Sequence, residues 1–222
     1  MVPRNKKENR KLTVEKTSEK GQEYFVLKHT GHKQNGYFVD IGAADGITAS
    51  NSFALEKWFK WNGICVDPNP VFMQSLMNCR DSSVSNLCVY SESGKIVPFK
   101  FFNNPELFYG WNFRSGLTEF VGIVNPEVMD QFREINVFTI SLNDLLELYH
   151  SPVNIDYISL DTEGSEYEIL KSFNFNKYNV KCFTIEHADS PLRDHIFELM
   201  ISKGYRRADE DQPDNEDWYV KL

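Results

Sequence analysis

The stretch YFVDIGAADG, residues 37–46, decides the fold. Its apolar residues lead into Asp40, and Gly42 and Gly46 follow with Asp45 between them. An apolar run bounded by glycines is typical of a strand that is buried on both faces of a parallel sheet. The glycines permit a tight turn after that strand. Ligands collect at such turns, because the turns lie at the carboxyl ends of the strands.

Strand-like and helix-like segments alternate on both sides of this stretch. Strands are predicted at residues 36–42, 63–70, 84–91, 154–161, 180–187 and 217–222, and helices at residues 23–30, 50–59, 71–80, 141–150, 164–173 and 191–204. This alternation predicts an α/β fold, a mostly parallel sheet with helices on both faces. Residues 94–138 lose the alternation, and we expect a hairpin arm there followed by an irregular, aromatic-rich insertion.

Composition indicates one domain preceded by a basic arm. The chain has 222 residues, of which 41% are hydrophobic, enough for one sizeable core. Residues 1–20 contain seven Lys or Arg and three Glu, and we interpret them as a solvated, partly disordered arm. Contact of this arm with an anionic surface is the alternative interpretation. Residues 21–222 are then a single catalytic or binding domain.

Net charge and hydropathy exclude some classes of partner. The formal net charge is -8 although the arm is basic, so the rest of the chain is strongly acidic. An acidic body argues against nucleic acid as the main partner. No apolar run approaches the roughly 20 residues of a membrane span, and no signal peptide is evident, so a cytoplasmic location is expected.

Acidic residues recur where three predicted strands end. Asp40, Asp67 and Asp161 occupy these positions, and carboxylates there would repel a pyrophosphate. The spacing from Gly42 to Gly46 also differs from the G-x-G-x-x-G of dinucleotide-binding folds. S-adenosylmethionine, with a sulfonium, an ammonium, a ribose diol and no phosphate, suits such a site. The alternative is a strand end with turn glycines and a capping aspartate.

Asp67 is placed to accept both ribose hydroxyls, and Tyr90 and Ser91 are placed to border an adenine ring. The candidate cofactor-binding residues are Asp40, Gly42, Ala43, Ala44, Asp45, Gly46, Asn51, Asp67, Asn69, Tyr90, Ser91 and Asp161.

Residues 36–70, 154–173 and 183–187 together resemble the FkbM-type methyltransferases. The motifs that carry the resemblance are the glycine turn, SNSFALE, GICVDPNP and DTEGSE. The resemblance implies a Rossmann-like class I methyltransferase fold with a seven-stranded sheet, S-adenosylmethionine as cofactor, and O-methylation of sugars or natural-product hydroxyls. Two positions depart from the family pattern: Asp67 stands where Glu is usual, and the early SQxGQD segment reads SEKGQEY at residues 18–24.

A sugar hydroxyl is a poor nucleophile, so methyl transfer to it benefits from a general base. Asp161, Glu163 and His187 are the candidates. Asp161 could instead only bind cofactor, Glu163 could cap the following helix, and His187 could be a rim histidine. A divalent cation held by Asp161, Glu186 and His187 is a further possibility, because these are ligand types for Mg²⁺ or Mn²⁺.

The acceptor pocket is expected within residues 99–120, where aromatic and polar side chains are mixed. Tyr109, Trp111 and Arg114 are the candidate substrate-binding residues, whereas the phenylalanines at 99, 101 and 102 are expected to pack against the sheet. The leading hypothesis is an O-methyltransferase of a sugar, as a glycan, nucleotide-sugar or glycoside. Alternatives are a cofactor-binding module without catalysis, an O-methyltransferase of a non-sugar molecule and an NAD-type dehydrogenase.

Overall fold

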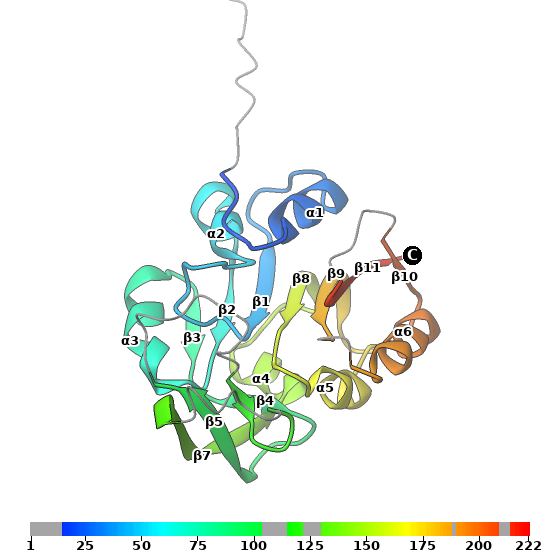
Figure 1. Cartoon of the computed structure of the whole chain (residues 1–222). Helices are drawn as coiled ribbons and strands as arrows, with labels where there is room; N and C mark the ends of the chain where they lie inside the picture. Colours follow the sequence, from blue (N-terminus) through cyan, green and yellow to red (C-terminus); the bar gives the residue numbers. More distant parts are fainter. Residues whose placement is uncertain (1–14, 104–114, 122–129, 188–189, 209–213) are drawn as a thin grey trace, which may run out of the picture.

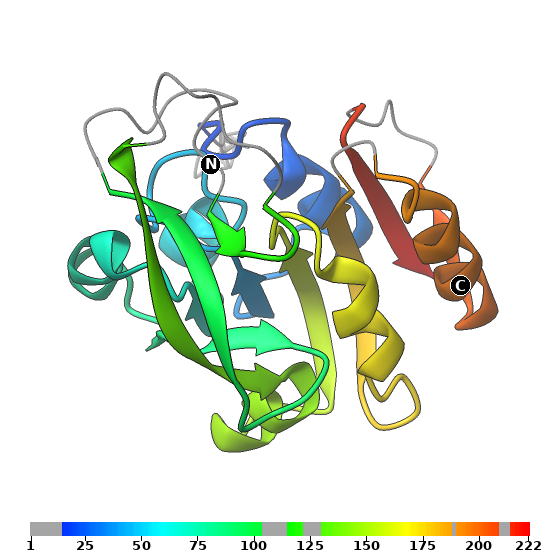
Figure 2. The ribbon, with the colours of Figure 1, turned by 60° about the horizontal axis from the view of Figure 1, so that its bottom comes forward.

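The computed structural model describes residues 15–103, 115–121, 130–187, 190–208 and 214–222. Within these ranges it has a seven-stranded sheet and a four-stranded sheet that lie against each other (Figures 1 and 2). Most of the predicted basic arm falls outside the described residues. Among the helices described, none combines the length and the apolar character that a bilayer span requires.

The larger sheet is mixed, and its strand order is β10-β11-β9-β8-β1-β2-β3. Its strands are β1 (Tyr37–Ile41), β2 (Asn62–Val66), β3 (Ser83–Ser85), β8 (Asn154–Leu160), β9 (Asn179–Glu186), β10 (Tyr205–Arg207) and β11 (Glu216–Lys221). Neighbours from β3 to β9 are parallel, and β11 runs antiparallel to both β9 and β10. The predicted mostly parallel sheet is therefore present, with an antiparallel strand near one edge.

Helices cover both faces of this sheet, as predicted (Figure 1). One face packs against α1 (Gln22–His29), α2 (Phe53–Phe59) and α3 (Pro70–Cys79), and the other against α4 (Leu142–Leu148), α5 (Glu166–Ser172) and α6 (Arg193–Ser202). The side chains of β1 alternate between the two cores: Phe38 joins the first, and Val39 and Ile41 join the second. This explains why the strand has no polar face in the sequence.

The smaller sheet corrects two sequence-based predictions. Its order is β4-β7-β5-β6, with β4 (Cys88–Tyr90), β5 (Ile96–Phe102), β6 (Gly116–Leu117) and β7 (Phe132–Ser141). The predicted strand at 84–91 is in fact two strands, β3 and β4, which belong to different sheets. β5 falls within the predicted hairpin arm, but its long antiparallel partner β7 begins in the region predicted to be irregular. Its pattern was obscured because β7 is buried only at its end and carries exposed polar residues at its start.

The register of the larger sheet brings three strand ends together. Ile41 of β1 pairs with Val66 of β2 and with Leu160 of β8. Gly42, Asp67 and Asp161 therefore begin three loops at one edge of the sheet. The Gly42 N–H donates to the Val66 carbonyl over 2.9 Å and the Asp161 N–H donates to the Ile41 carbonyl over 3.0 Å. This edge is where the candidate site lies.

Candidate active site

A pocket of about 750 Å³, its open mouth included, lies at this edge between the two sheets. It is lined by Ile41, Gly42, Ala44, Val66, Asp67, Pro68, Phe72, Cys88, Val89, Phe99, Ser115, Leu117, Asp161, Thr162, Glu163 and Ser165. Three of these residues are acidic, and none of the described lining residues is Lys, Arg or His. The pocket thus joins a carboxylate-rich edge to an apolar wall.

The turn after β1 approaches β8 so closely that only glycine fits. Gly42 has φ 85°, and a Cβ built on it would lie 1.9 Å from the Asp161 carbonyl oxygen. A backbone atom cannot move aside as the end of a side chain can. Gly42 therefore allows the glycine turn and the Asp161 turn to form one continuous pocket floor.

Asp67 is a buried carboxyl that shapes the pocket wall. Its Oδ2 accepts the Ala44 N–H over 2.8 Å and its Oδ1 accepts the Asn69 N–H over 2.8 Å. A carboxylate has about four acceptor positions, so capacity remains for a ligand. Burial, with the charges of Asp161 and Asp40 adding to it, raises the pKa of Asp67 to about 6 despite these bonds.

Three carboxyl groups converge at the other end of the pocket. One oxygen each of Asp161, Glu163 and Glu186 lies within 4.8 Å of the others. Burial and the charges of Asp161 and Glu163 raise the pKa of Glu186, so this carboxyl holds a proton more readily than a carboxyl in water does. Asp161 and Glu163 line the pocket and are the groups placed to take up a proton there.

His187 has a different environment from the one predicted. Its side chain is buried, and its Nε2 lies 3.9 Å from Asp217 Oδ1. His187 is not among the residues that line the pocket. The geometry therefore favours Asp161 and Glu163 over His187 as the base.

The predicted metal set is only partly assembled. Asp161 and Glu186 come together, but the third carboxyl is that of Glu163 rather than the imidazole of His187. Carboxylate oxygens are ligands that Mg²⁺ uses, so these three residues could hold a cation. Acidic groups also gather in many proteins without an ion. Metal dependence stays a prediction.

Comparison with known proteins identifies the family. The family model described as "Methyltransferase FkbM domain" matches residues 40–207. The chain belongs to the FkbM methyltransferase family. Its chemistry is thus methyl transfer, for which S-adenosylmethionine is the cofactor that the family implies. None of the curated proteins matches this FkbM-family methyltransferase.

Two solved methyltransferase structures match this FkbM-family chain at low identity and with TM-scores below 0.5. The precorrin-6y C5,15-methyltransferase of Geobacter metallireducens has 11% identity and a TM-score of 0.44, covering 94% of this chain and 90% of its own. A methyltransferase of Pyrococcus furiosus has 14% identity and a TM-score of 0.41, with 90% and 81% covered.

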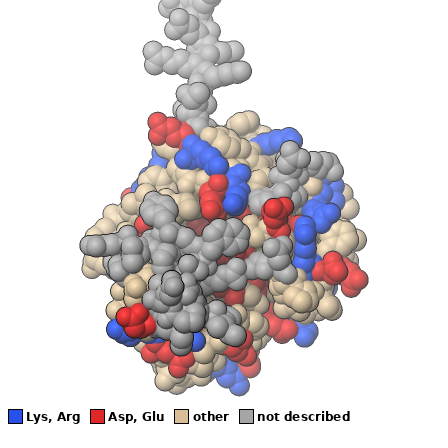
Figure 3. Space-filling model, in the orientation of Figure 1, with Lys and Arg blue, Asp and Glu red and all other residues tan. Residues whose placement is uncertain are grey.

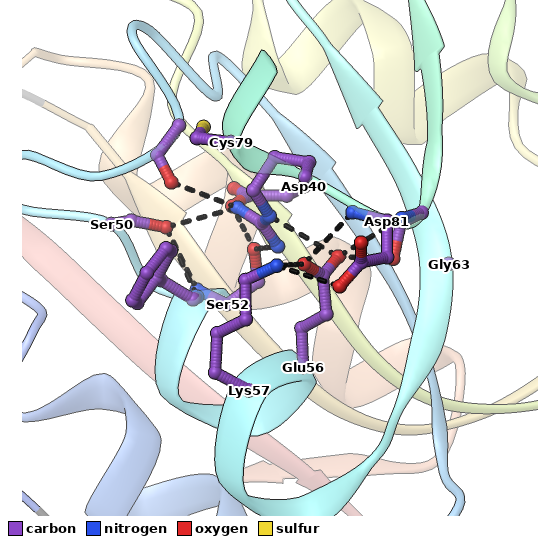
Figure 4. A network of polar contacts seen from close by, with 12 residues as sticks. Asp40, Ser50, Ser52, Glu56, Lys57, Gly63, Cys79 and Asp81 are labelled. Atoms are coloured by element: carbon purple, nitrogen blue, oxygen red, sulfur yellow. Dashed lines mark hydrogen bonds and ion pairs between the residues drawn. The ribbon is translucent and has the colours of Figure 1, made fainter. Parts of the chain in front are cut away.

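Asp40 of this methyltransferase lies in a buried polar network instead of the pocket lining (Figure 4). It is paired within the sheet, opposite Cys65 and Ser159, and accepts a hydrogen bond from the Ser52 hydroxyl. The Arg80 guanidinium donates to Ser52 Oγ over 2.8 Å. Asp40 thus anchors Ser52 at the start of α2, and its direct contact with cofactor stays a prediction.

Arg80 is the cation at the centre of this network. It also donates to the Gly46 carbonyl over 3.2 Å and to Glu56 Oε2 over 3.2 Å. Burial alone would raise the pKa of Glu56. The charge of Arg80 and the hydrogen bonds from Ser82 and Lys57 outweigh burial and lower this pKa to about 2. Glu56 therefore contributes stability above its ordinary pKa, and that contribution is lost as pH falls toward 2.

Replacing Arg80 with Met should lower the free energy of unfolding by about 3–5 kcal/mol at pH 7, because buried carboxylates would lose their cation. Urea denaturation measures the change. Lys57→Met is the matched control, since Lys57 contacts the same Glu56 from a more exposed position and should cost about 0–1 kcal/mol. Equal losses in the two variants would contradict this account.

Other predicted cofactor residues form local bonds next to the pocket. Asp45 accepts the N–H groups of residues 47 and 48, and Asn51 donates to the Ser159 hydroxyl. Asn69 caps α3 by accepting the Val71 N–H. These side chains stabilise the loops around the pocket, and their direct contact with cofactor remains a prediction.

The remaining predicted residues are distributed as follows. Gly42 and Ala44 line the pocket, whereas Ala43 and Gly46 are buried outside its lining. Tyr90 and Ser91 are half-buried outside the lining, and the Tyr90 hydroxyl donates to Glu119 over 3.1 Å. Tyr109, Trp111 and Arg114 lie outside the described residues.

Sequence reasoning missed the apolar wall. Phe72, Val89, Phe99 and Leu117 line the pocket, although Phe99 was expected only to pack. The expected burial of Phe99 is confirmed, since 4% of the residue is exposed, but Phe99 also forms part of the pocket wall. Their positions in the sequence could have indicated this wall. Phe72 follows the predicted strand at 63–70, and Val89 lies near the end of the predicted strand at 84–91.

Proposed function

We propose that the protein is an S-adenosylmethionine-dependent O-methyltransferase that acts on a sugar hydroxyl. The observation that carries the proposal is the pocket, which is lined by three acidic residues and, among its described lining residues, by no Lys, Arg or His. The order β3-β2-β1-β8-β9-β11-β10 supports assignment to the seven-stranded class I methyltransferase fold that the family resemblance implies.

The residues present fit this cofactor. Asp67 retains acceptor positions for the two ribose hydroxyls, and Pro68, Phe72 and Val89 offer an apolar surface for an adenine ring. The absence of a Cβ at Gly42 keeps the floor open between these residues and Asp161. When bound, the cofactor supplies an electrophilic methyl group on a positively charged sulfur. Carboxylates at the opposite end favour that charge.

Asp161 and Glu163 would accept the proton of the acceptor hydroxyl. General-base assistance is worth about 10²–10⁴-fold in rate. Glu186 is not among the residues that line the pocket, but its carboxyl lies within 4.8 Å of those of Asp161 and Glu163, whose charges raise its pKa. The chain thereby contributes orientation and proton acceptance.

A sugar is the acceptor class that the family resemblance supports. Asp161 and Glu163 line the pocket and would repel a negatively charged group, so an uncharged acceptor suits it. On the face in Figure 3, the described Lys and Arg side chains are scattered among Asp and Glu. A polynucleotide would need a continuous basic band along its backbone. The described part of this face shows no such band, and the pocket lining is acidic, so we propose a glycan or glycoside acceptor in preference to nucleic acid.

The test is mass spectrometry of candidate glycans and glycosides incubated with the protein and methyl-labelled S-adenosylmethionine. We expect a gain of one labelled methyl group on a sugar hydroxyl. Label appearing on a non-sugar small molecule would contradict the acceptor class. Cofactor binding without transfer to any tested acceptor would favour a module without catalysis.

Cofactor affinity should depend on pH through Asp67. Its carboxylate form accepts the ribose hydroxyls, and its pKa of about 6 places protonation within an accessible range. Calorimetric titration should show affinity rising by about tenfold in total from pH 5 to pH 7 and levelling off above that. Asp67→Asn should abolish this pH dependence. A flat profile in the unchanged protein would contradict the assigned role.

A further inference from the structure

The turn that carries Asp161 and Glu163 has a backbone conformation that needs support. Glu163 has φ 61° and Gly164 has φ 119°. A left-handed conformation in a residue other than glycine costs about 1–3 kcal/mol and persists only where the surroundings hold it. The side chain of Glu163 enters the pocket from this strained position. What holds the turn therefore also places the proposed base groups.

Glu166, at the start of α5, holds the turn from one side. Its side chain is buried, with 2% of the residue exposed. Its Oε1 accepts the Thr162 N–H over 2.7 Å and the Thr162 hydroxyl over 2.8 Å. Its Oε2 accepts the Gly164 N–H over 3.1 Å. One carboxylate thus bonds backbone groups on both sides of Glu163.

The smaller sheet confines the turn from the other side. A Cβ built on Gly116 of β6 would lie 3.1 Å from the Thr162 carbonyl oxygen and 3.2 Å from Glu163 Cβ. A Cβ built on Gly164 would lie 3.0 Å from Phe120 Cβ. The turn is therefore fixed between α5 and β6, with little space in which to relax.

We propose that Glu166 is a positioning residue for methyl transfer, holding Asp161 and Glu163 in the pocket through the backbone of the turn. This inference rests on the proposed function. Glu166 is not among the pocket-lining residues, so it acts through the turn instead of touching the reactants. A displacement of about 1 Å in a catalytic group can reduce the rate about 10²-fold.

The experiment compares Glu166→Gln with the unchanged protein. The amide keeps the shape of the side chain but turns an acceptor into a donor that faces a backbone N–H. Glu168→Gln is the matched control, because Glu168 lies on the same helix and forms an ion pair with Lys171, at 3.8 Å, away from the turn. Thr162→Val is the second variant, since it removes one hydroxyl donor to Glu166 and leaves the carboxylate intact.

Three measurements separate positioning from general stability. Hydrogen exchange followed by mass spectrometry reports the amides of the 161–165 turn, and calorimetry with S-adenosylhomocysteine reports cofactor-site affinity. Turnover of the sugar methylated in the assay above gives kcat and KM. For Glu166→Gln we expect faster exchange confined to the turn, affinity within about twofold, and kcat lower by about 10²-fold. Thr162→Val should show a smaller change of the same kind.

The inference would be overturned by normal exchange in the turn, or by kcat equal to that of Glu168→Gln. It would also be overturned if exchange rose across the whole larger sheet, since that would mark a merely structural role. Failure of the proposed function would appear differently, in the unchanged protein, as absence of S-adenosylhomocysteine binding or of methyl transfer to a sugar. The exchange pattern of the turn would still decide whether Glu166 holds it.

Discussion

Asp161→Asn should reduce kcat by about 10²–10⁴-fold and change the affinity for S-adenosylmethionine far less. The amide keeps the size of the side chain but cannot accept the hydroxyl proton. A carboxyl oxygen of Glu163 lies within 4.8 Å of one of Asp161, so Glu163 can replace part of the lost function. The double variant Asp161→Asn with Glu163→Gln should therefore have a still lower kcat. Steady-state kinetics with separate variation of cofactor and acceptor measures both effects.

His187→Asn is the matched control for this prediction. His187 is buried beside Asp217 and is not among the residues lining the pocket, so its replacement should leave kcat within a few-fold of the unchanged protein. A large loss of kcat in His187→Asn with little loss in the Asp161 and Glu163 variants would reverse the assignment of the base.

Gly42→Ala should both destabilise the protein and remove cofactor binding. The new Cβ would lie 1.9 Å from the Asp161 carbonyl oxygen, so the ends of β1 and β8 would have to separate. Backbone strain at φ 85° adds about 1–3 kcal/mol to the cost of that separation. We expect the free energy of unfolding to fall by more than about 3 kcal/mol, with no measurable S-adenosylmethionine binding.

Gly94→Ala separates the close contact from the strain. Gly94 has a similar φ of 81°, but a Cβ there meets nothing within 4 Å. This variant should lose only the strain energy, about 1–3 kcal/mol, and should bind cofactor normally. Urea denaturation and calorimetry apply to both variants. Equal effects at the two glycines would show that the approach of β1 to β8 is not what matters.

The strand ends of the site could be predicted from sequence because they follow from local pattern. The apolar runs before Gly42, Asp67 and Asp161 specify buried parallel strands, whose ends must share an edge. What a side chain does at that edge depends on which way it points. Successive side chains of a strand point to opposite faces of the sheet. Asp40 lies one residue before the end of β1, so it points toward Ser52 and Arg80, on the face of the sheet opposite the pocket.

The smaller sheet and the positioning of His187 could not be predicted in the same way. β7 pairs with β5 from more than thirty residues away and carries exposed polar residues, so its strand pattern is weak. His187 follows its strand as expected, but its environment is set by Asp217 on β11, a neighbour that the sequence does not reveal. Non-local partners, rather than local propensity, decide these features.

The most direct test of the account is calorimetric titration of the unchanged protein and of Asp67→Asn, each with S-adenosylmethionine and with NAD at pH 7.5. The account predicts saturable binding of S-adenosylmethionine to one site, at least about tenfold weaker binding in Asp67→Asn, and no binding of NAD. Binding of NAD in preference to S-adenosylmethionine, or equal affinity of both proteins for S-adenosylmethionine, would contradict it.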